Sequence, residues 1–177
     1  IYINTDNGVT FNGVSSVTTA DLVASNGIVH IVDSVIGLPT VVTFAVADPN
    51  FEILVQALTR DDLTMDFVGL LNSSTIPPTP LTVFAPVNNA FVNLLDELGL
   101  NGLNDIDEPT LSAVLTYHVV TGANQLSINL SDGMEFTTAG GGALLFNFGD
   151  NGEGVLTDNN GRTSNIVAVD VQANNGI

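Results

Sequence analysis

The spacing of apolar residues divides the chain into three parts, and the first covers residues 1–39. Here apolar and polar residues alternate in short runs rich in Val and Ile, separated by turns such as Asp6-Asn7-Gly8, Asn12-Gly13 and Asn26-Gly27. Alternation with a period of two is typical of β-strands, and Asn-Gly favours tight hairpin turns. The pattern predicts strands joined by hairpins up to Gly37-Leu38-Pro39. Strands alone cannot bury both faces of so small a sheet, so we expect this segment to need a packing partner.

From residue 44 the apolar spacing becomes that of helices. Apolar residues at i, i+3, i+4 and i+7 predict amphipathic helices, and the stretches with this spacing are Asp48–Leu63, Asn88–Leu100 and Asp107–Val120. Asp48 precedes Pro49, which is typical of a capped helix start. A loop is predicted over residues 73–80, and a short strand follows at Leu81–Val87.

After Gly122 the pattern returns to short apolar runs between Gly-containing turns. The predicted strands are Ala143–Phe148, Gly154–Thr157 and Asn165–Ala173. The order of β-rich, helical and β-rich parts predicts an α+β fold class.

The two β-rich ends also share sequence with each other. Asp21–Ile28 aligns with Asp170–Ile177 at an offset of 149 residues, from Asp21 to Asp170. The turns Asn12-Gly13 and Asn160-Gly161 correspond with one residue of slippage. A match at such a distance indicates a repeat of the size of a domain.

The repeat leads to a hypothesis about domain organisation. Residues 1–39 are interpreted as the C-terminal part of one repeat, and residues 40–177 as the following repeat without its final strand. The missing part would correspond to Val29–Pro39. Two explanations stay open: the sequence is a window on a longer tandem array, or identical chains complete each other by strand addition and form a filament.

Charge and composition narrow the classes of partner. Nineteen Asp and Glu residues stand against Arg60 and Arg162 alone, and the formal net charge is −17. Such a chain repels nucleic acid and anionic lipid, and phosphorylated cofactors are disfavoured for the same reason. The absence of Cys excludes disulfides and thiolate metal sites. No apolar run reaches the roughly 18–20 residues that span a bilayer, so no membrane insertion is expected in this segment.

Three stretches taken together resemble the fasciclin-like domain family. They are "LTVFAPVNNAF" (Leu81–Phe91), "LSAVLTYHVV" (Leu111–Val120) and "NGIVHIVDSVIGLP" (Asn26–Pro39). The resemblance covers essentially the whole chain. It implies an α+β domain, a wedge-shaped β-sandwich with helices packed at one end. It also implies tandem occurrence in secreted or cell-surface adhesion proteins.

The pair Tyr117-His118 is what the family resemblance associates with adhesion and partner binding. His118 follows Leu111 and Leu115 at helical spacing, so it belongs to the apolar face of the predicted helix. A packed, hydrogen-bonded histidine is therefore the alternative to a binding role. Tyr117 is expected on another face of the helix and partly exposed.

Other residues of the resembling stretches are assigned structural roles. His30 shares one side of its strand with Ile28 and Val32, which predicts burial. Asn88 is predicted to cap the helix that begins there, and the resemblance implies that it anchors the structure. Asp33 and Pro86 are further members of the structural motif.

Acidic turns raise the hypothesis of calcium binding. Asp150 and Asp158 open turns rich in Asn and Gly, and oxygen-rich turns can ligate calcium. Neither turn has the spacing of a twelve-residue calcium loop, and tight turns require these same residue types. Turn formation is the favoured interpretation, and no cofactor other than calcium is considered. Asn72 and Asn129 lie in glycosylation motifs.

The leading hypothesis is a non-enzymatic, extracellular or cell-surface repeat that acts in adhesion or structure through protein–protein contacts. Its expected partners are neighbouring repeats or identical chains, and a surface protein or glycan. The alternative is a module that binds carbohydrate or a matrix polymer, with calcium assisting. No nucleophile and base occur in an arrangement that would indicate an enzyme.

Overall fold

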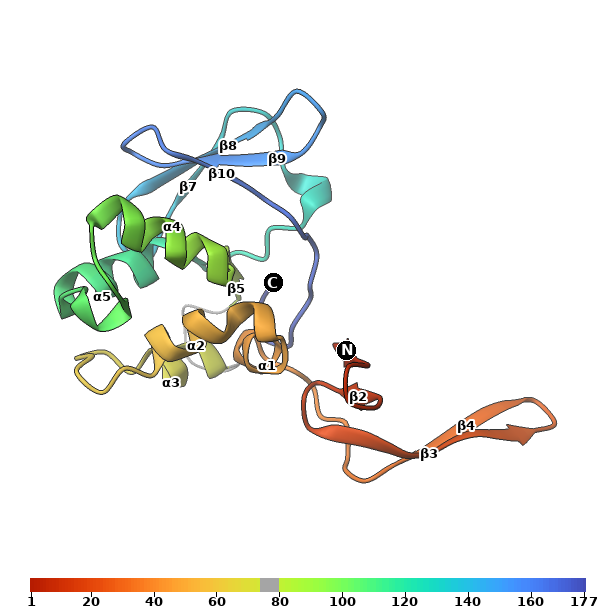
Figure 1. The fold of residues 1–177 in the computed structure, drawn as a ribbon. Coiled ribbons are helices and arrows are strands. Elements are labelled where there is room, and N and C mark those ends of the chain that lie inside the picture. Colours follow the sequence, from red (N-terminus) through yellow and green to blue (C-terminus); the bar gives the residue numbers. More distant parts are fainter. Residues whose placement is uncertain (74–79) are drawn as a thin grey trace.

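The computed structural model describes residues 1–73 and 80–177, and its architecture confirms the α+β class (Figure 1). Most of the loop predicted over residues 73–80 lies outside the described residues. The helices are α1 (Val41–Ala47), α2 (Glu52–Leu58), α3 (Phe67–Asn72), α4 (Asn88–Leu98) and α5 (Glu108–Tyr117), with 3-10 turns η1 (Pro49–Phe51), η2 (Leu103–Asp105) and η3 (Ser127–Asn129). The strands are β1 (Ile3–Asn4), β2 (Thr10–Phe11), β3 (Ser15–Ala24), β4 (Gly27–Val32), β5 (Leu81–Val83), β6 (Val119–Thr121), β7 (Met134–Thr137), β8 (Ala143–Phe148), β9 (Gly154–Thr157) and β10 (Thr163–Asn165).

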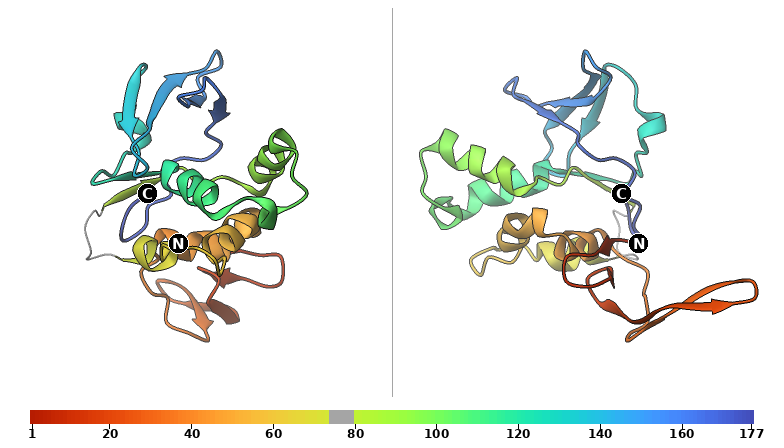
Figure 2. Two further views of the ribbon diagram at one scale, coloured as in Figure 1. Left: turned by 90° about the vertical axis from the view of Figure 1, so that its left-hand side faces the viewer. Right: turned by 45° about the vertical axis from the view of Figure 1, so that its right-hand side comes forward.

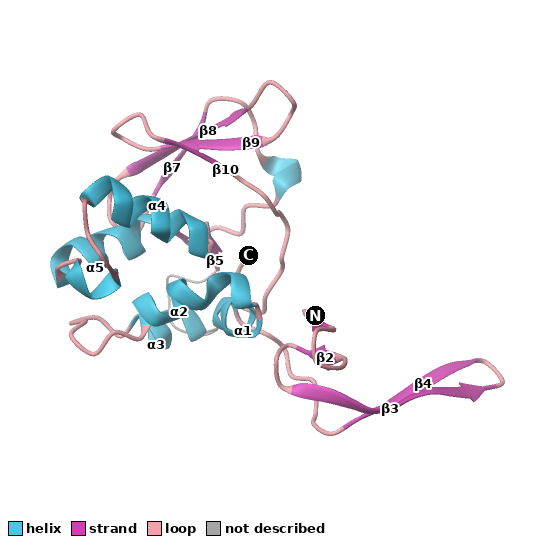
Figure 3. Cartoon of the chain, in the orientation of Figure 1, coloured by secondary structure: helices cyan, strands magenta, loops and turns pink. Residues whose placement is uncertain are grey.

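The strands form separate antiparallel sheets around a helical middle. One sheet has the order β1-β2-β3-β4, another the order β10-β9-β8-β7, and β5 pairs with β6. The β7–β10 sheet lies beyond α4 and α5, and α1 to α3 lie on the opposite side of these two helices (Figures 1 and 2). The helices thus gather in one region of the molecule, as the secondary-structure colouring shows (Figure 3).

Two apolar cores hold this body together. The helical core contains these buried residues: Leu54, Ala57, Leu58, Phe67, Leu71, Leu81, Phe91, Ile106, Leu111, Leu115 and Val119. The core under the β7–β10 sheet contains Val120, Phe136, Leu144, Phe146 and Leu156. The residues that the helical spacing placed on inner faces, such as Phe91 and Leu111, are almost fully buried. Because β6 contributes Val119 to the first core and Val120 to the second, it connects the helices to the sheet.

Helix α1 was not predicted, because its sequence "VVTFAVA" is rich in β-branched residues. Its start is fixed by a capping box, in which the Thr40 side chain accepts from the Thr43 N–H and the Thr43 side chain accepts in return. Phe44 buries the inner face of this helix. Capping and burial therefore outweigh the low helix propensity of valine.

Within the described residues, no single helix is long and apolar enough to cross a membrane. Helix α1 together with the stretch Pro49–Leu58 meets a criterion of length and composition only as a pair bent by 102°.

The strand predicted over Asn165–Ala173 is wrong for most of its length. β10 ends at Asn165, and Ile166 donates one more bond to the Gly154 carbonyl oxygen. From Val167 to Gln172, no backbone group forms a backbone hydrogen bond within the described residues. Alternation of apolar residues describes an extended conformation, but a strand also requires a neighbour to pair with.

The two segments aligned in sequence have the same backbone at matched positions. Asp21 has φ 60° and Asp170 has φ 59°. Such values are uncommon for residues other than glycine. The turns match as well: Ala24 pairs with Gly27 across the β3–β4 hairpin, and the Ala173 N–H donates to the Gly176 carbonyl at 2.8 Å.

Candidate interaction site

His118 lies where α5 ends and β6 begins. Its backbone N–H donates to the Leu115 carbonyl, and its ring Nδ1 lies 2.7 Å from the Val114 carbonyl oxygen. Its own carbonyl accepts from the Phe84 N–H at 2.9 Å, beside β5. Burial lowers the pKa of His118, so the ring is held neutral at neutral pH. These contacts give His118 a packing role at the junction of helix and sheet.

Tyr117 is half-buried and bridges α5 to the β7–β10 sheet. Its hydroxyl donates to the Ala143 carbonyl at the start of β8 and accepts from the Asn159 N–H at 3.2 Å. A Cβ placed on Gly142 would lie 2.3 Å from the Tyr117 ring, so the glycine allows the close approach. The Tyr117 hydroxyl is therefore used within the domain. Binding of a partner by Tyr117 stays a prediction.

Asn88 anchors two helices, but it does not cap its own. Helix α4 has Val87 as its N-cap and no side-chain cap bond. The Asn88 Oδ1 accepts instead from the Ile53 N–H at 2.9 Å, and its Nδ2 donates to the Pro49 carbonyl at 2.9 Å. The prediction that Asn88 caps α4 was therefore wrong, because its side chain bonds to the start of α2 instead. Asn88 satisfies a free N–H in the first turn of α2 and so fixes the distance between α2 and α4.

His30 is exposed, which contradicts its predicted burial. Its side chain is 46% exposed, and its Nδ1 accepts from the Asp21 N–H at 3.2 Å. The alternation placed His30 correctly on one strand face, but no described element packs on that face. Asp33, at the other end of the hairpin, accepts from the Ser16 N–H at 2.7 Å. Pro86 is half-buried in the short link between β5 and α4.

The β3–β4 hairpin projects from the body (Figures 1 and 2), and apolar side chains along it are exposed. We call the exposed apolar side chains of the hairpin and of the segment that follows β4 the hairpin surface, and they are Leu22, Val23, Ile28, Val29, Ile31, Val35, Ile36 and Leu38. Val23 is 86% exposed and Val35 is 91% exposed. Large exposed apolar surface marks interaction sites in soluble proteins.

The acidic turns are arranged around backbone and arginine donors. Asp158 Oδ1 accepts from the Asn160 and Arg162 N–H groups, and its Oδ2 accepts from Arg162 Nε at 2.6 Å. Asp150 is exposed in the turn between β8 and β9. Within residues 1–73 and 80–177, no group of three or more acidic, His or Cys side chains is placed to hold a metal ion. Calcium binding by Asp150 or Asp158 stays a prediction.

The two glycosylation motifs lie on different elements. Asn129 is exposed in η3, and Asn72 is the last residue of α3. Ser74 of the Asn72 motif falls outside the described residues. Modification at either position stays a prediction.

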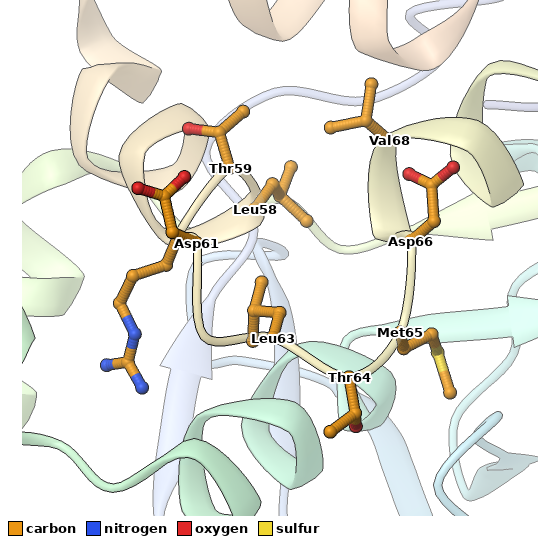
Figure 4. Close-up of a pocket in the computed structure, with 9 residues that line it drawn as sticks. Leu58, Thr59, Asp61, Leu63, Thr64, Met65, Asp66 and Val68 are labelled. Carbon is orange, nitrogen blue, oxygen red and sulfur yellow. The ribbon is translucent and has the colours of Figure 1, made fainter.

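A depression between α2 and α3 is a candidate for small-molecule binding (Figure 4). It has a volume of about 340 Å³ and is lined by Leu58, Thr59, Arg60, Asp61, Leu63, Thr64, Met65, Asp66 and Val68. Arg60 is committed elsewhere, because its guanidinium donates to Asp62 and to the carbonyls of Leu103 and Ile106. The Thr64 hydroxyl is likewise used within the domain, because it donates to Glu108 Oε1 at 3.0 Å.

Asn175 is a buried anchor that the sequence did not reveal. It is 2% exposed, and its Oδ1 accepts from the Val41 N–H while its Nδ2 donates to the carbonyls of Leu71 and Ser73. Its backbone carbonyl accepts from the Leu81 N–H at 3.0 Å. Asn175 thus holds the segment 174–177 against α1, α3 and β5. Its counterpart in the sequence alignment, Asn26, is exposed, so the aligned sequences alone do not distinguish the buried asparagine from the exposed one.

Comparisons with known proteins agree with this architecture. A family model described as "Fasciclin domain" matches residues 1–39 and 49–177. An uncharacterized protein of Synechocystis sp. is 33% identical over 144 residues, covering 79% of this chain and 92% of that protein. Human periostin is 28% identical over 123 residues, covering 67% of this chain and 13% of periostin. On this family match and on the shared α+β architecture, the chain belongs to the fasciclin domain family.

Proposed function

We propose that the chain is an extracellular or cell-surface repeat that acts in adhesion or structure, through protein–protein contacts and without chemistry. Fasciclin domains are adhesion-type modules of secreted and cell-surface proteins, and membership of the family supports this role. The finer proposal is that contacts between repeats, or between identical chains, build an array or filament.

The observation that carries the proposal is the hairpin surface. Val23 of β3 is 86% exposed on a hairpin that extends away from the body, and Val35 and Leu38, in the segment that follows β4, are 91% and 82% exposed. Burying a valine or leucine side chain contributes about 1.5–3 kcal/mol, so a few such residues can drive association. The net charge of −17 opposes non-specific aggregation, which favours a defined contact over general stickiness.

The alternative is a module that binds carbohydrate or a matrix polymer with the help of calcium. Its support is the set of exposed acidic turns, such as the one at Asp150. Calorimetric titration of the protein with calcium chloride, and binding to a glycan array with and without calcium, distinguish it from the first proposal. Calcium-dependent glycan binding would replace the protein-contact proposal.

A bead-clustering assay tests the proposed function. Beads coated with the protein are expected to cluster in EDTA, and beads coated with a Val23→Ser, Val35→Ser, Leu38→Ser variant are expected to stay dispersed. Ile128→Ser is the matched control, because Ile128 is 86% exposed on η3, outside the hairpin surface. Equal clustering by the triple variant and the wild type would refute the proposal.

A further inference from the structure

Seven asparagines of the chain are each followed by glycine, and such pairs can react with themselves. They are Asn7, Asn12, Asn26, Asn101, Asn151, Asn160 and Asn175. The backbone nitrogen of the glycine can attack the side-chain amide carbon of the asparagine, because glycine has no Cβ that hinders the approach. The reaction requires an amide side chain that can turn, a glycine N–H outside any hydrogen bond, and access to water. The structure separates the seven pairs by these requirements.

Two of the asparagines are held by their own side chains. Asn12 is 6% exposed, and its Oδ1 accepts from the Tyr2 N–H at 2.9 Å. Asn175 is 2% exposed, and its amide group bonds to the Val41 N–H and to the Leu71 carbonyl. Neither side chain can turn toward the nitrogen of the following glycine unless the structure opens first.

In four further pairs the backbone of the glycine is restrained. In the turns at Asn151 and Asn160, the N–H of the following glycine donates to a backbone carbonyl, at 2.9 Å and 3.0 Å. The glycine after Asn7 forms a β-bridge with Asp6, and the glycine after Asn26 pairs with β3 in the hairpin. These asparagines are exposed, but the attacking nitrogen is not free to move.

Asn101 meets all three requirements. It is exposed in the loop between α4 and α5 (Figure 1). Within the described residues, neither its side chain nor the Gly102 N–H makes a hydrogen bond. Gly102 has an extended backbone, with φ −171° and ψ 170°, just before η2. The attacking nitrogen and the amide carbon are therefore both unrestrained at this pair.

The rest of this loop is anchored independently of the Asn101 side chain. The Arg60 guanidinium donates to the carbonyls of Leu103 and Ile106, at 3.0 Å and 2.7 Å. The Asn101 backbone N–H donates to Asp105 Oδ2 at 3.0 Å. A carboxylate at position 101 would repel the Asp105 carboxylate, so this last bond is the one that a modification weakens. The bonds from Arg60 keep the loop in place.

We propose that Asn101 is the site at which the folded chain modifies itself first, by attack of the Gly102 nitrogen on Asn101 Cγ. The new N–C bond forms as the Gly102 nitrogen gives its proton to water, and the bond to the amide nitrogen breaks as ammonia leaves. Water then opens the resulting succinimide ring at either carbonyl and leaves aspartate or isoaspartate. The product adds one negative charge to a chain of net charge −17. This reaction is independent of the proposed adhesion role.

The first test measures deamidation at all seven pairs in the folded protein, at mildly alkaline pH and physiological temperature. Samples are digested with pepsin in acid, where the attack is suppressed because the nitrogen must lose its proton, and the peptides are quantified by mass spectrometry. The Asn101 peptide should deamidate at least about tenfold faster than the Asn160 and Asn175 peptides, because those pairs must open first. In concentrated urea the seven rates should converge. An Asn101 rate no higher than that of Asn160 in the folded protein overturns the proposal, as does an unchanged ratio in urea.

The second test uses Gly102→Ala. A Cβ at Gly102 meets no atom within 4 Å, and a φ of −171° suits any residue, so the variant should keep the fold. Deamidation of Asn101 should slow at least about tenfold, because the added methyl group hinders the attack. Gly37→Ala is the matched control, since a Cβ there also meets open space, and it should leave the Asn101 rate unchanged. A wild-type rate in Gly102→Ala, with an unchanged circular dichroism spectrum, overturns the attack by the Gly102 nitrogen.

The third test identifies the product. Isoaspartate forms only through the ring, and an isoaspartyl methyltransferase labels it with a methyl group from S-adenosylmethionine. The label should accumulate at residue 101 of the aged wild type. In Asn101→Gln it should fall at least about tenfold, because the longer side chain must close a larger ring, which fixes more dihedral angles. Deamidation at Asn101 without methyl labelling would mean direct hydrolysis of the amide and overturns the proposed reaction.

Discussion

Replacement of Asn175 by alanine is expected to destabilise the fold far more than the same change at Asn26. Asn175 is 2% exposed, and its amide group bonds to the Val41 N–H at 3.1 Å and to the Leu71 carbonyl at 2.7 Å. Asn26 is its counterpart in sequence, but it is exposed in the hairpin turn. The pair therefore compares one residue type in two environments at matched positions.

The expected loss of stability follows from the backbone groups of Val41 and Leu71, which lose their bonds to the Asn175 side chain in Asn175→Ala. A buried polar group without its partner costs about 1–3 kcal/mol. Because the Val41 N–H lies at a helix start, where water can reach it in part, we expect a total loss of about 2–3 kcal/mol rather than the full sum. Asn26→Ala should change the free energy of unfolding by less than ~0.5 kcal/mol.

Urea unfolding followed by far-ultraviolet circular dichroism measures both values. The midpoint should fall for Asn175→Ala with an unchanged slope, which indicates a change of stability and not of the surface exposed on unfolding. Thermal melting should show a drop of roughly 4–12 °C for a chain of this size. Equal effects of the two substitutions, or a neutral Asn175→Ala, would refute the anchoring role of Asn175.

Three further predictions follow from the same contacts. Asn88→Ala should lower the free energy of unfolding, measured in urea, by about 1–2 kcal/mol, because the bonds to Ile53 and Pro49 are lost. Asn89→Ala, at an exposed neighbour, should lower it by less than ~0.5 kcal/mol. A larger loss for Asn89→Ala than for Asn88→Ala would contradict the anchoring role of Asn88. Arg60→Lys should lower Tm by roughly 3–8 °C, because lysine cannot bond at once to a carboxylate and two carbonyls, while Arg162→Lys, at a side chain that is 52% exposed, should change it little; similar shifts would contradict this. Burial lowers the pKa of His118 below the value of about 6.5 in the unfolded chain, so its contribution to stability is complete above about pH 6.5 and declines as the pH falls below it; His118→Asn should flatten the decline of unfolding free energy between about pH 7 and 5.5, and an unchanged slope counts against the assignment.

Periodicity predicted much of this fold, since helical and strand spacing are local properties of the sequence. It placed Phe91 and Leu111 on the inner faces of their helices, and both are almost fully buried. It missed α1, which depends on a capping box and on the burial of Phe44. Propensity alone favours strand for its valines.

The errors at His30 and Asn88 have a common physical cause. Alternation shows which residues share a face, but burial depends on what packs against that face, which is a tertiary property. Likewise, Asn88 was expected to cap the nearest helix, yet the free N–H that it reaches belongs to Ile53, distant in sequence. The burial of Asn175 could not be predicted either, because its partners Val41 and Leu71 are distant in sequence.

Hydrogen–deuterium exchange at low and high protein concentration tests the proposed contact through the hairpin surface most directly. Amides of β3 and β4 should exchange fast at low concentration and become protected as the concentration rises, because association covers the hairpin. Amides in the β7–β8 pair should show the same protection throughout. If the chain associates while the amides of β3 and β4 keep exchanging fast, the contact through the hairpin surface is wrong.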